Sequence, residues 1–120
     1  MKGQRLFVRP IEAGDADALG EFYVRHGGGP VPRSGLIGKL VGELAAVLTM
    51  EVEPDTIRVT GLVVAEELRR KRVGRVMLDE LAGIAVRMHR DWLVASLECR
   101  AFFERVGFHE VDGVVKRRVG

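Results

Sequence analysis

A basic segment between an apolar run and a helical pattern is the part of this chain best suited to chemistry. Leu62, Val63 and Val64 predict a strand, and the pattern from Gly74 onward predicts a helix. The segment that joins them is basic, and its residues are Arg69, Arg70, Lys71, Arg72, Val73, Gly74 and Arg75. The first N–H groups of a helix point outward and its macrodipole is positive there, so this junction favours an anion. The order of strand, cationic loop and helix therefore predicts a phosphate-binding site, although a basic run alone is more often a solvated face.

Few other residues have types and spacing that suit catalysis. Glu51 and Glu53 alternate along an expected strand and could help water to deprotonate an amine, although solvated edge-strand charge is the commoner explanation. Cys99 is the single cysteine, has no histidine near it in sequence, and is more simply a packing residue. His26, beside a run of glycines, could line a substrate site but is more often just exposed. The three histidines have no metal-ligand spacing, so we expect no metal site.

The composition is that of an ordinary globular protein. With 120 residues, 47% of them hydrophobic and 30% charged, we expect a single domain over residues 1–120. The formal net charge of +2 does not argue for nucleic acid, and no aromatic residues are interleaved with the basic segment. One cysteine excludes an internal disulfide, and no apolar run suits a membrane span or a signal peptide. We therefore expect a cytoplasmic protein that binds neither nucleic acid nor a membrane.

The apolar periodicity predicts alternating strands and helices. Residues 36–52 could be one amphipathic helix, but Gly35, Gly38 and Gly42 favour two strands, since each glycine costs a helix about 1 kcal/mol. Asp15 is the expected cap of the first helix, and Asp112–Gly113 is a hairpin signal. The expected strands are 5–9, 36–41, 44–53, 57–64, 92–97 and one or two within 108–119, and the expected helices are 11–25, 74–88 and 98–105. This order predicts a mixed sheet flanked by helices.

Three segments resemble, in this order, the GNAT superfamily of acyl-CoA-dependent N-acyltransferases. They are FVRPIEAGDADAL near the start, LVVAEELRRKRVGRVMLDELAGIA in the middle and FFERVGFHEVDG near the end. The middle segment resembles the family's acyl-CoA pyrophosphate motif, usually written Q/R-x-x-G-x-G/A, and the last resembles its late helix and strand. Together the segments span nearly the whole chain, so the set is more specific than any one match.

The resemblance implies a fold and a cofactor site. The fold would be α/β, a mixed and mostly antiparallel twisted sheet flanked by helices, with the fourth strand splayed from the fifth. Acetyl-CoA would be the co-substrate, its pantetheine arm on the backbone of Leu62–Val64 and its pyrophosphate wrapped by Arg69–Arg75, mainly through N–H groups. Phe103 would contact the cofactor while packing in the core. The acceptor would be an amine of a small molecule or peptide, and the resemblance allows a homodimer formed near Val114–Val119.

The sequence departs from the family pattern at two positions. Arg72 replaces the motif's central glycine, which serves where the backbone takes a positive φ or approaches a phosphate. Phe103 replaces a tyrosine that often protonates the departing thiolate, and a phenyl ring cannot donate a proton. Only Gly27–Ser34 remains for the family's second helix, which predicts an open acceptor side.

Two functions follow from the resemblance and its departures. The first is an N-acetyltransferase in which a primary amine attacks acetyl-CoA directly, with a backbone N–H near Val64 polarising the thioester carbonyl. The alternative is a catalytically degenerate GNAT-fold module that binds acyl-CoA, or only a protein partner, without turnover. Arg72 and Phe103 are the residues that motivate the alternative.

Overall fold

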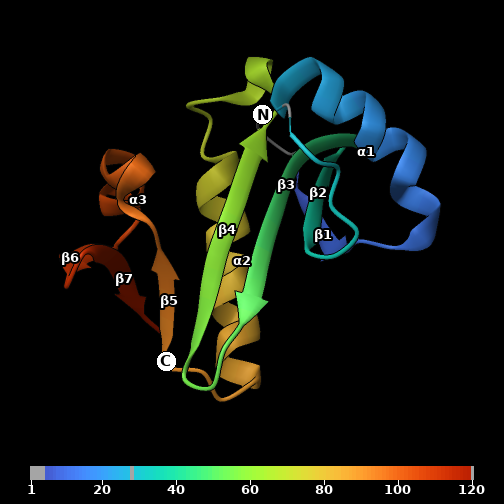
Figure 1. Cartoon of the computed structure of the whole chain (residues 1–120). Helices are drawn as coiled ribbons and strands as arrows, with labels where there is room; N and C mark the ends of the chain where they lie inside the picture. Colours follow the sequence, from blue (N-terminus) through green and yellow to red (C-terminus); the bar gives the residue numbers. More distant parts are fainter. Residues whose placement is uncertain (1–4, 28, 120) are drawn as a thin grey trace. The chain divides into compact units, whose positions relative to one another are not determined.

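The computed structural model in Figure 1 describes residues 5–27 and 29–119, and its sheet has seven strands in the order β1-β2-β3-β4-β5-β7-β6. β4 and β5 are parallel, whereas the pairs β1–β2, β2–β3, β5–β7 and β6–β7 are antiparallel, so the sheet is mixed and mostly antiparallel, as predicted. The strands are β1 (Phe7–Pro10), β2 (Leu36–Leu40), β3 (Glu43–Val52), β4 (Thr56–Val64), β5 (Trp92–Ala95), β6 (His109–Val111) and β7 (Val114–Arg118). The α-helices are α1 (Ala16–Phe22), α2 (Val73–Arg87) and α3 (Arg100–Arg105).

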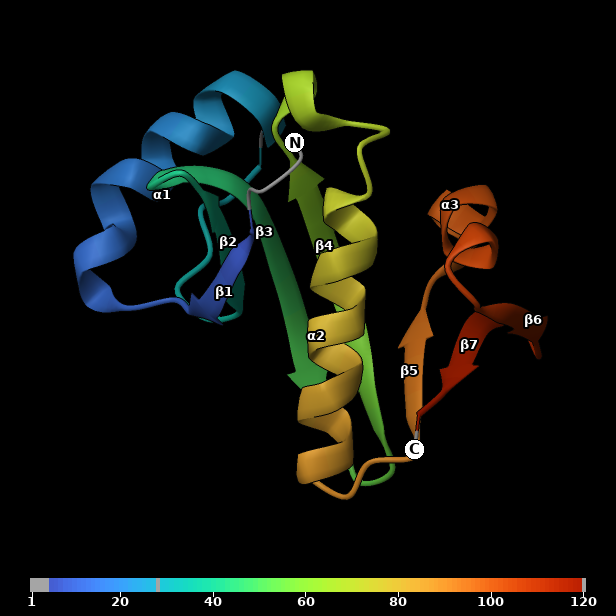
Figure 2. The same cartoon turned by 180° about the vertical axis from the view of Figure 1, so that it is seen from behind.

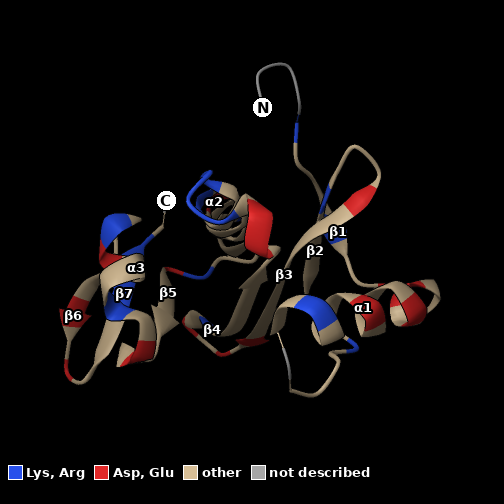
Figure 3. Cartoon of the chain, turned by 90° about the horizontal axis from the view of Figure 1, so that it is seen from above, with Lys and Arg blue, Asp and Glu red and all other residues tan. Residues whose placement is uncertain are grey.

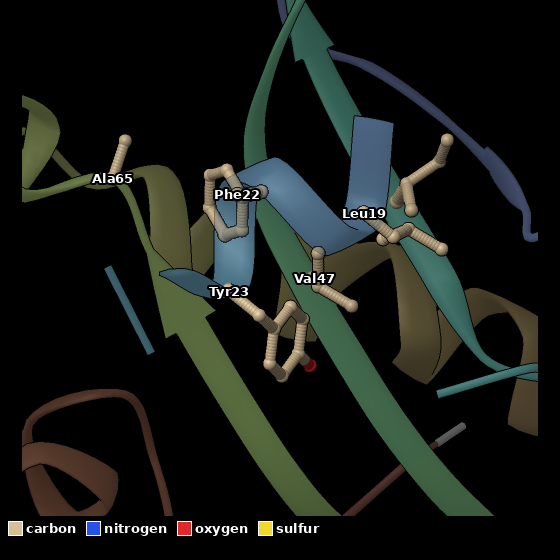
Figure 4. Close-up of a cluster of buried hydrophobic side chains, with 6 residues drawn as sticks. Leu19, Phe22, Tyr23, Val47 and Ala65 are labelled. Carbon is tan, nitrogen blue, oxygen red and sulfur yellow. The ribbon is translucent and has the colours of Figure 1, made fainter. Parts of the chain in front are cut away.

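The chain divides into two compact units, and β3, β4 and α2 each contribute residues to both. The first unit consists of Met1–Thr49 and Gly61–Met77. Its core joins α1 and the turn after it to the strands, as Figure 4 shows for Phe22 and Val47. The buried side chains of this cluster are Leu19, Phe22, Tyr23, Ile37, Val47 and Ala65. Burial raises the pKa of the Tyr23 hydroxyl, which fits a residue of the core.

The second unit consists of Met50–Thr60 and Leu78–Gly120. In it the parallel β4–β5 ladder covers Thr56–Arg58, opposite Trp92–Val94; a splay of the two strands beyond this ladder stays a prediction. β7 pairs with β5 on one side and with β6 on the other. β6, and not β7, is therefore the edge strand at this side of the sheet. A homodimer and a single cooperative domain both stay predictions.

Residues 36–52 form two strands, as their glycines predicted. Val41 and Gly42, with φ of 52° and 80°, join β2 to β3. Asp112 and Gly113, with φ of 51° and 83°, join β6 to β7 in the same way, so the hairpin signal is confirmed. Two successive positive φ values are the pattern of the type I′ turn, whose twist suits antiparallel strands.

The first helix is shorter than its sequence pattern predicted, because a 3-10 turn at Ala13–Asp15 precedes α1 and a π-helical turn at Tyr23–Gly27 follows it. Asp15 lies at the start of α1 as expected, but its carboxylate points back along the chain. It accepts hydrogen bonds from both Arg9 Nη atoms, at 2.8 and 2.7 Å, and from the Glu12 N–H at 2.7 Å. The Arg9 guanidinium holds the pKa of this carboxyl well below its usual range. Asp15 therefore ties β1 to the first helix.

Candidate phosphate-binding site

The predicted site begins where β4 ends. The Ala65 N–H donates to Ala45 O at 2.8 Å, and a 3-10 turn at Glu66–Leu68 then leads the chain into a loop that enters α2 at Val73 (Figure 2). Val73 and Gly74 are buried, so the first turn of α2 is packed against the rest of the protein. The sequence prediction of strand, basic loop and helix is confirmed in this order.

The loop takes an unusual backbone conformation at two arginines. Arg70 has φ of 65° and Arg72 has φ of 67°, in the left-handed region that is costly for a residue with a side chain. Arg72 O accepts the N–H of Val76 at 3.0 Å, so Arg72 lies at the N-cap position of α2. The next three N–H groups, of Val73, Gly74 and Arg75, have no intrahelical acceptor by the geometry of a helix start. Arg72 thus adopts the kind of φ for which the family motif uses glycine.

The loop carries positive charge that no carboxylate neutralises among the described residues. Arg70, Lys71, Arg72 and Arg75 are exposed, and Figure 3 shows Lys and Arg gathered where the chain enters α2. The ion pairs of the described chain involve other arginines, namely Arg9, Arg58, Arg100 and Arg117. Outward N–H groups at a helix start together with unneutralised cations suit a multiply charged anion such as a pyrophosphate.

Arg69 differs from its basic neighbours. Its Nε donates to Val64 O at 3.2 Å and its Nη2 donates to His26 O at 3.1 Å, while His26 Nδ1 accepts the Glu66 N–H at 3.1 Å. The side chain is therefore already engaged with the protein, although the sequence placed it with the phosphate-binding residues. His26 and Glu66 are 40 positions apart, so no local pattern could have revealed this contact.

The three apolar residues proposed to contact pantetheine lie at the end of β4. Leu62, Val63 and Val64 are half-buried, and Val63 packs against the core cluster of the first unit. Gly27 lies close to this strand, since a Cβ there would be 3.1 Å from Val63 Cγ1. The end of β4 is thus held from one side by the turn that follows α1.

The two glutamates proposed to assist catalysis differ in their surroundings. Glu51 is an exposed residue of β3. The Glu53 carboxylate accepts hydrogen bonds from Thr56 Oγ1 at 2.9 Å and from Arg58 Nε and Nη2 at 3.2 and 3.4 Å. Arg58, followed by Thr56, lowers the pKa of Glu53. A carboxylate that is engaged in this way is a weaker base. Glu51 has no such contact among the described residues, but it lies six residues along β3 from Ala45, which pairs with Ala65, so it is not positioned beside the end of β4.

The remaining residues singled out from the sequence lie in the second unit. Phe103 is buried, with ring centroids 5.3 Å from Phe102 and 4.9 Å from Phe108, which confirms its place in the core; contact with a cofactor stays a prediction. Cys99 is exposed, so its interpretation as a packing residue is wrong. No metal-ligand group of three or more His, Cys, Asp or Glu occurs in residues 5–27 and 29–119, and no helix there is long and apolar enough to cross a membrane.

Comparison with solved structures shows that the fold is shared with acetyltransferases. The ribosomal-protein-S18-alanine N-acetyltransferase of Escherichia coli has a TM-score of 0.78 at 16% identity, covering 97% of this chain and 95% of that one. The N-acetylglutamate synthase of Neisseria gonorrhoeae, solved with coenzyme A and L-arginine, has a TM-score of 0.77 at 16% identity, covering 95% of this chain and 33% of that one. A GNAT family acetyltransferase of Elizabethkingia anophelis with acetyl-CoA bound has a TM-score of 0.69 at 13% identity, covering 95% of this chain and 98% of that one.

Comparison of the sequence with protein families identifies the family itself. No curated protein matches the sequence. The family model described as an acetyltransferase (GNAT) domain matches residues 18–110, which include β4, the basic loop and the late helix α3. The chain therefore belongs to the GNAT acetyltransferase domain family.

Proposed function

We propose that this protein is an N-acetyltransferase that transfers an acetyl group from acetyl-CoA to the primary amine of a small molecule or peptide. Membership of the GNAT family supports the reaction class. Structural neighbours described as an alanine N-acetyltransferase and as an acetyl-CoA complex support the acceptor and donor classes. The observation that carries the proposal is the loop of positive-φ arginines, free of carboxylate partners in the described chain, at the start of α2. The cytoplasm is the compartment that we propose.

The basic loop would bind the donor through its diphosphate. The N–H groups of Val73, Gly74 and Arg75 would donate to phosphate oxygens, and the side chains of Arg70 and Arg72 would neutralise their charge. The backbone of Leu62–Val64 would hold the pantetheine arm in extended conformation. Binding at these two places fixes the donor, and placement of this kind can supply roughly 7–11 kcal/mol of barrier reduction.

The transfer needs few catalytic groups. Bound acetyl-CoA supplies an acyl group already activated as a thioester. A backbone N–H near Val64 would polarise its carbonyl, the amine nitrogen forms the new C–N bond, and the C–S bond breaks. Water would receive the proton that the amine loses, because Glu51 lies six residues along β3 from Ala45, the residue that pairs with Ala65 beside Val64, and six extended residues span roughly 20 Å. Because Phe103 cannot donate a proton, the thiolate would take its proton from solvent.

Thermal unfolding with acetyl-CoA, CoA and a short oligonucleotide tests the proposal. We expect both CoA species to raise Tm, because binding to the folded protein increases its free energy of unfolding by RT ln(1 + [L]/Kd). The oligonucleotide should have no effect on Tm. Release of free thiol over a panel of amines then distinguishes an enzyme from the degenerate binding module. No shift with either CoA species at millimolar concentration would exclude the enzyme and the acyl-CoA-binding module, and would leave only a module that binds a protein partner.

The base is tested separately with Glu51→Gln. We expect kcat, its pH profile and acetyl-CoA affinity to stay within about twofold of wild type, because Glu51 is distant along β3 from the residue that pairs beside Val64. A fall in kcat of about 100-fold would instead make Glu51 the general base.

A further inference from the structure

The loop after β4 is held in place by two side chains from outside the phosphate-binding backbone. His26, at the π-helical turn after α1, accepts the Glu66 N–H with its Nδ1 at 3.1 Å. Arg69 spans the loop itself, with Nε on Val64 O and Nη2 on His26 O. Three hydrogen bonds thus close a link between residues 26, 64, 66 and 69, and all of them lie in the first compact unit.

Packing places His26 so that this link can form. Its ring lies 4.9 Å from the ring of buried Phe22, with an interplanar angle of 53°. The following residue, Gly27, approaches Val63 so closely that a Cβ would lie 3.1 Å from a methyl group. A glycine at this position therefore lets the turn lie against the end of β4, and the ring contact orients the imidazole.

Two acceptor atoms of His26 face the loop. Its Nδ1 accepts the Glu66 N–H through the ring lone pair. His26 O is also used, as the acceptor for Arg69. The Nδ1 and the carbonyl oxygen of His26 thus both bind the loop.

We propose that His26 and Arg69 are positioning residues that hold the loop after β4 in its phosphate-binding conformation before the donor arrives. Arg70 and Arg72 have positive φ, a conformation that a loop of non-glycine residues does not keep without support. Preorganisation lowers the ordering cost that binding would otherwise carry. Arg69 then contributes to binding through the loop rather than through a phosphate. This inference rests on the proposed function for its effect on acetyl-CoA, but the link itself can be tested without a ligand.

Two substitutions of His26 separate its acceptor from its ring. In His26→Asn the Oδ1 is as many bonds from the backbone as Nδ1, so the acceptor is kept and the ring contact with Phe22 is lost. In His26→Phe the ring is kept and the acceptor is lost. We expect His26→Phe to raise the Kd for acetyl-CoA about tenfold, the effect of one or two lost hydrogen bonds, and His26→Asn to stay within about twofold. kcat at saturating acetyl-CoA should change less than twofold in both, because the link touches no reacting atom.

Substitution of Arg69 separates its geometry from its charge. Arg69→Lys keeps the positive charge but cannot span two carbonyl oxygens with a planar fork, so Kd should again rise about tenfold. Arg25→Lys is the matched control. Arg25 is exposed in the π-helical turn that contains His26, and it has no hydrogen bond among the described contacts. It should leave Kd unchanged.

Hydrogen exchange of the apo-protein gives the decisive, ligand-free measurement. The Glu66 amide should exchange faster in His26→Phe and at the wild-type rate in His26→Asn. The opposite order would show that ring packing holds the turn, and equal protection in both would show that the link has no role. If the wild type binds no acetyl-CoA but the exchange order holds, the proposed function fails and the link stands.

Discussion

The turns at the two ends of β4 are built in opposite ways. Before the strand, Glu53 donates its N–H to Thr56 O and accepts hydrogen bonds from Thr56 and Arg58, while its own carbonyl accepts Arg90 Nε at 2.7 Å. After the strand, the exposed cations of the basic loop carry no ion pair among the described residues, and two of them have a positive φ. Glu53 and Arg58 at the first turn pair with one another, whereas the cations of the second turn have no carboxylate partner in the described chain and are available to a ligand.

The difference separates a turn that stabilises the fold from one that serves a function. Repulsion among like charges and left-handed backbone both lower the free energy of unfolding, so they persist where a ligand compensates them. The engaged Arg69 fits this division, because it supports the loop and leaves the ligand to its neighbours. The comparison predicts that substitutions in the loop after β4 alter binding more than stability, and that those before β4 do the reverse.

Charge reversal in the first turn of α2 should have the largest effect. Arg75 is exposed, and this turn has no acidic residue. Arg75→Glu should weaken acetyl-CoA binding about tenfold or more, because a charge-assisted contact becomes repulsive. The same change should stabilise the apo-protein by about 0.3–1 kcal/mol, since a carboxylate there complements the helix dipole. Melting curves with and without acetyl-CoA measure both quantities.

The control for this variant is Arg105→Glu, which alters net charge equally at an exposed position of α3. It should change acetyl-CoA affinity less than about twofold. If both variants weaken binding alike, the long-range field of the protein and not the loop attracts the donor.

Substitution of Arg72 separates backbone strain from side-chain charge. Arg72→Gly relieves the positive φ and Arg72→Ala does not, so the glycine variant should be more stable than the alanine variant by about 1 kcal/mol. If N–H groups carry most of the phosphate binding, Arg72→Gly should bind acetyl-CoA within about threefold of wild type. An equal, tenfold loss in both variants would instead assign the binding to the guanidinium. Chemical denaturation and calorimetric titration supply the two measurements.

Local patterns in the sequence predicted the elements that depend on local physics. Glycine at positions 42 and 113 located both hairpins, and the helical period located α2 within one residue at each end. The run of basic residues between a predicted strand and a predicted helix was enough to locate the loop after β4. Each of these features depends on residues that are near one another in the chain.

Contacts between distant residues could not be predicted in this way. The hydrogen bond between His26 and Glu66 and the place of β7 between two strands both depend on tertiary packing. The basic run also gave no sign that Arg69 differs from Arg70, because both have the same side chain and similar neighbours. Charge patterning therefore identified the loop but not the role of each arginine.

The turn between β2 and β3 contains a residue with positive φ but no cation. It tests whether backbone strain alone is enough to identify a binding loop. Val41 is 74% exposed with φ of 52°, at a turn position that favours asparagine. Val41→Asn should stabilise the protein by about 0.5–1 kcal/mol, and Asp112→Val, at the equivalent position of the other hairpin, should destabilise it by a similar amount. Acetyl-CoA affinity should not change in either variant. A loss of affinity in Val41→Asn would extend the donor site to the β2–β3 hairpin.

The turn before β4 should give the smallest effect, and one that depends on pH. The folded-state pKa of Glu53 is lowered by Arg58 and Thr56, so its charge stabilises the fold above the pKa of an unfolded glutamate, about 4.3, and this stabilisation is lost as pH falls through the lowered value. Glu53→Gln should lower Tm by a few degrees at pH 7, less at high salt because both partners are partly exposed, and the difference should vanish in acid. kcat should remain within about twofold of wild type. A large loss of kcat with an unchanged Tm would make Glu53 a functional residue, and the contrast between the two turns would then fail.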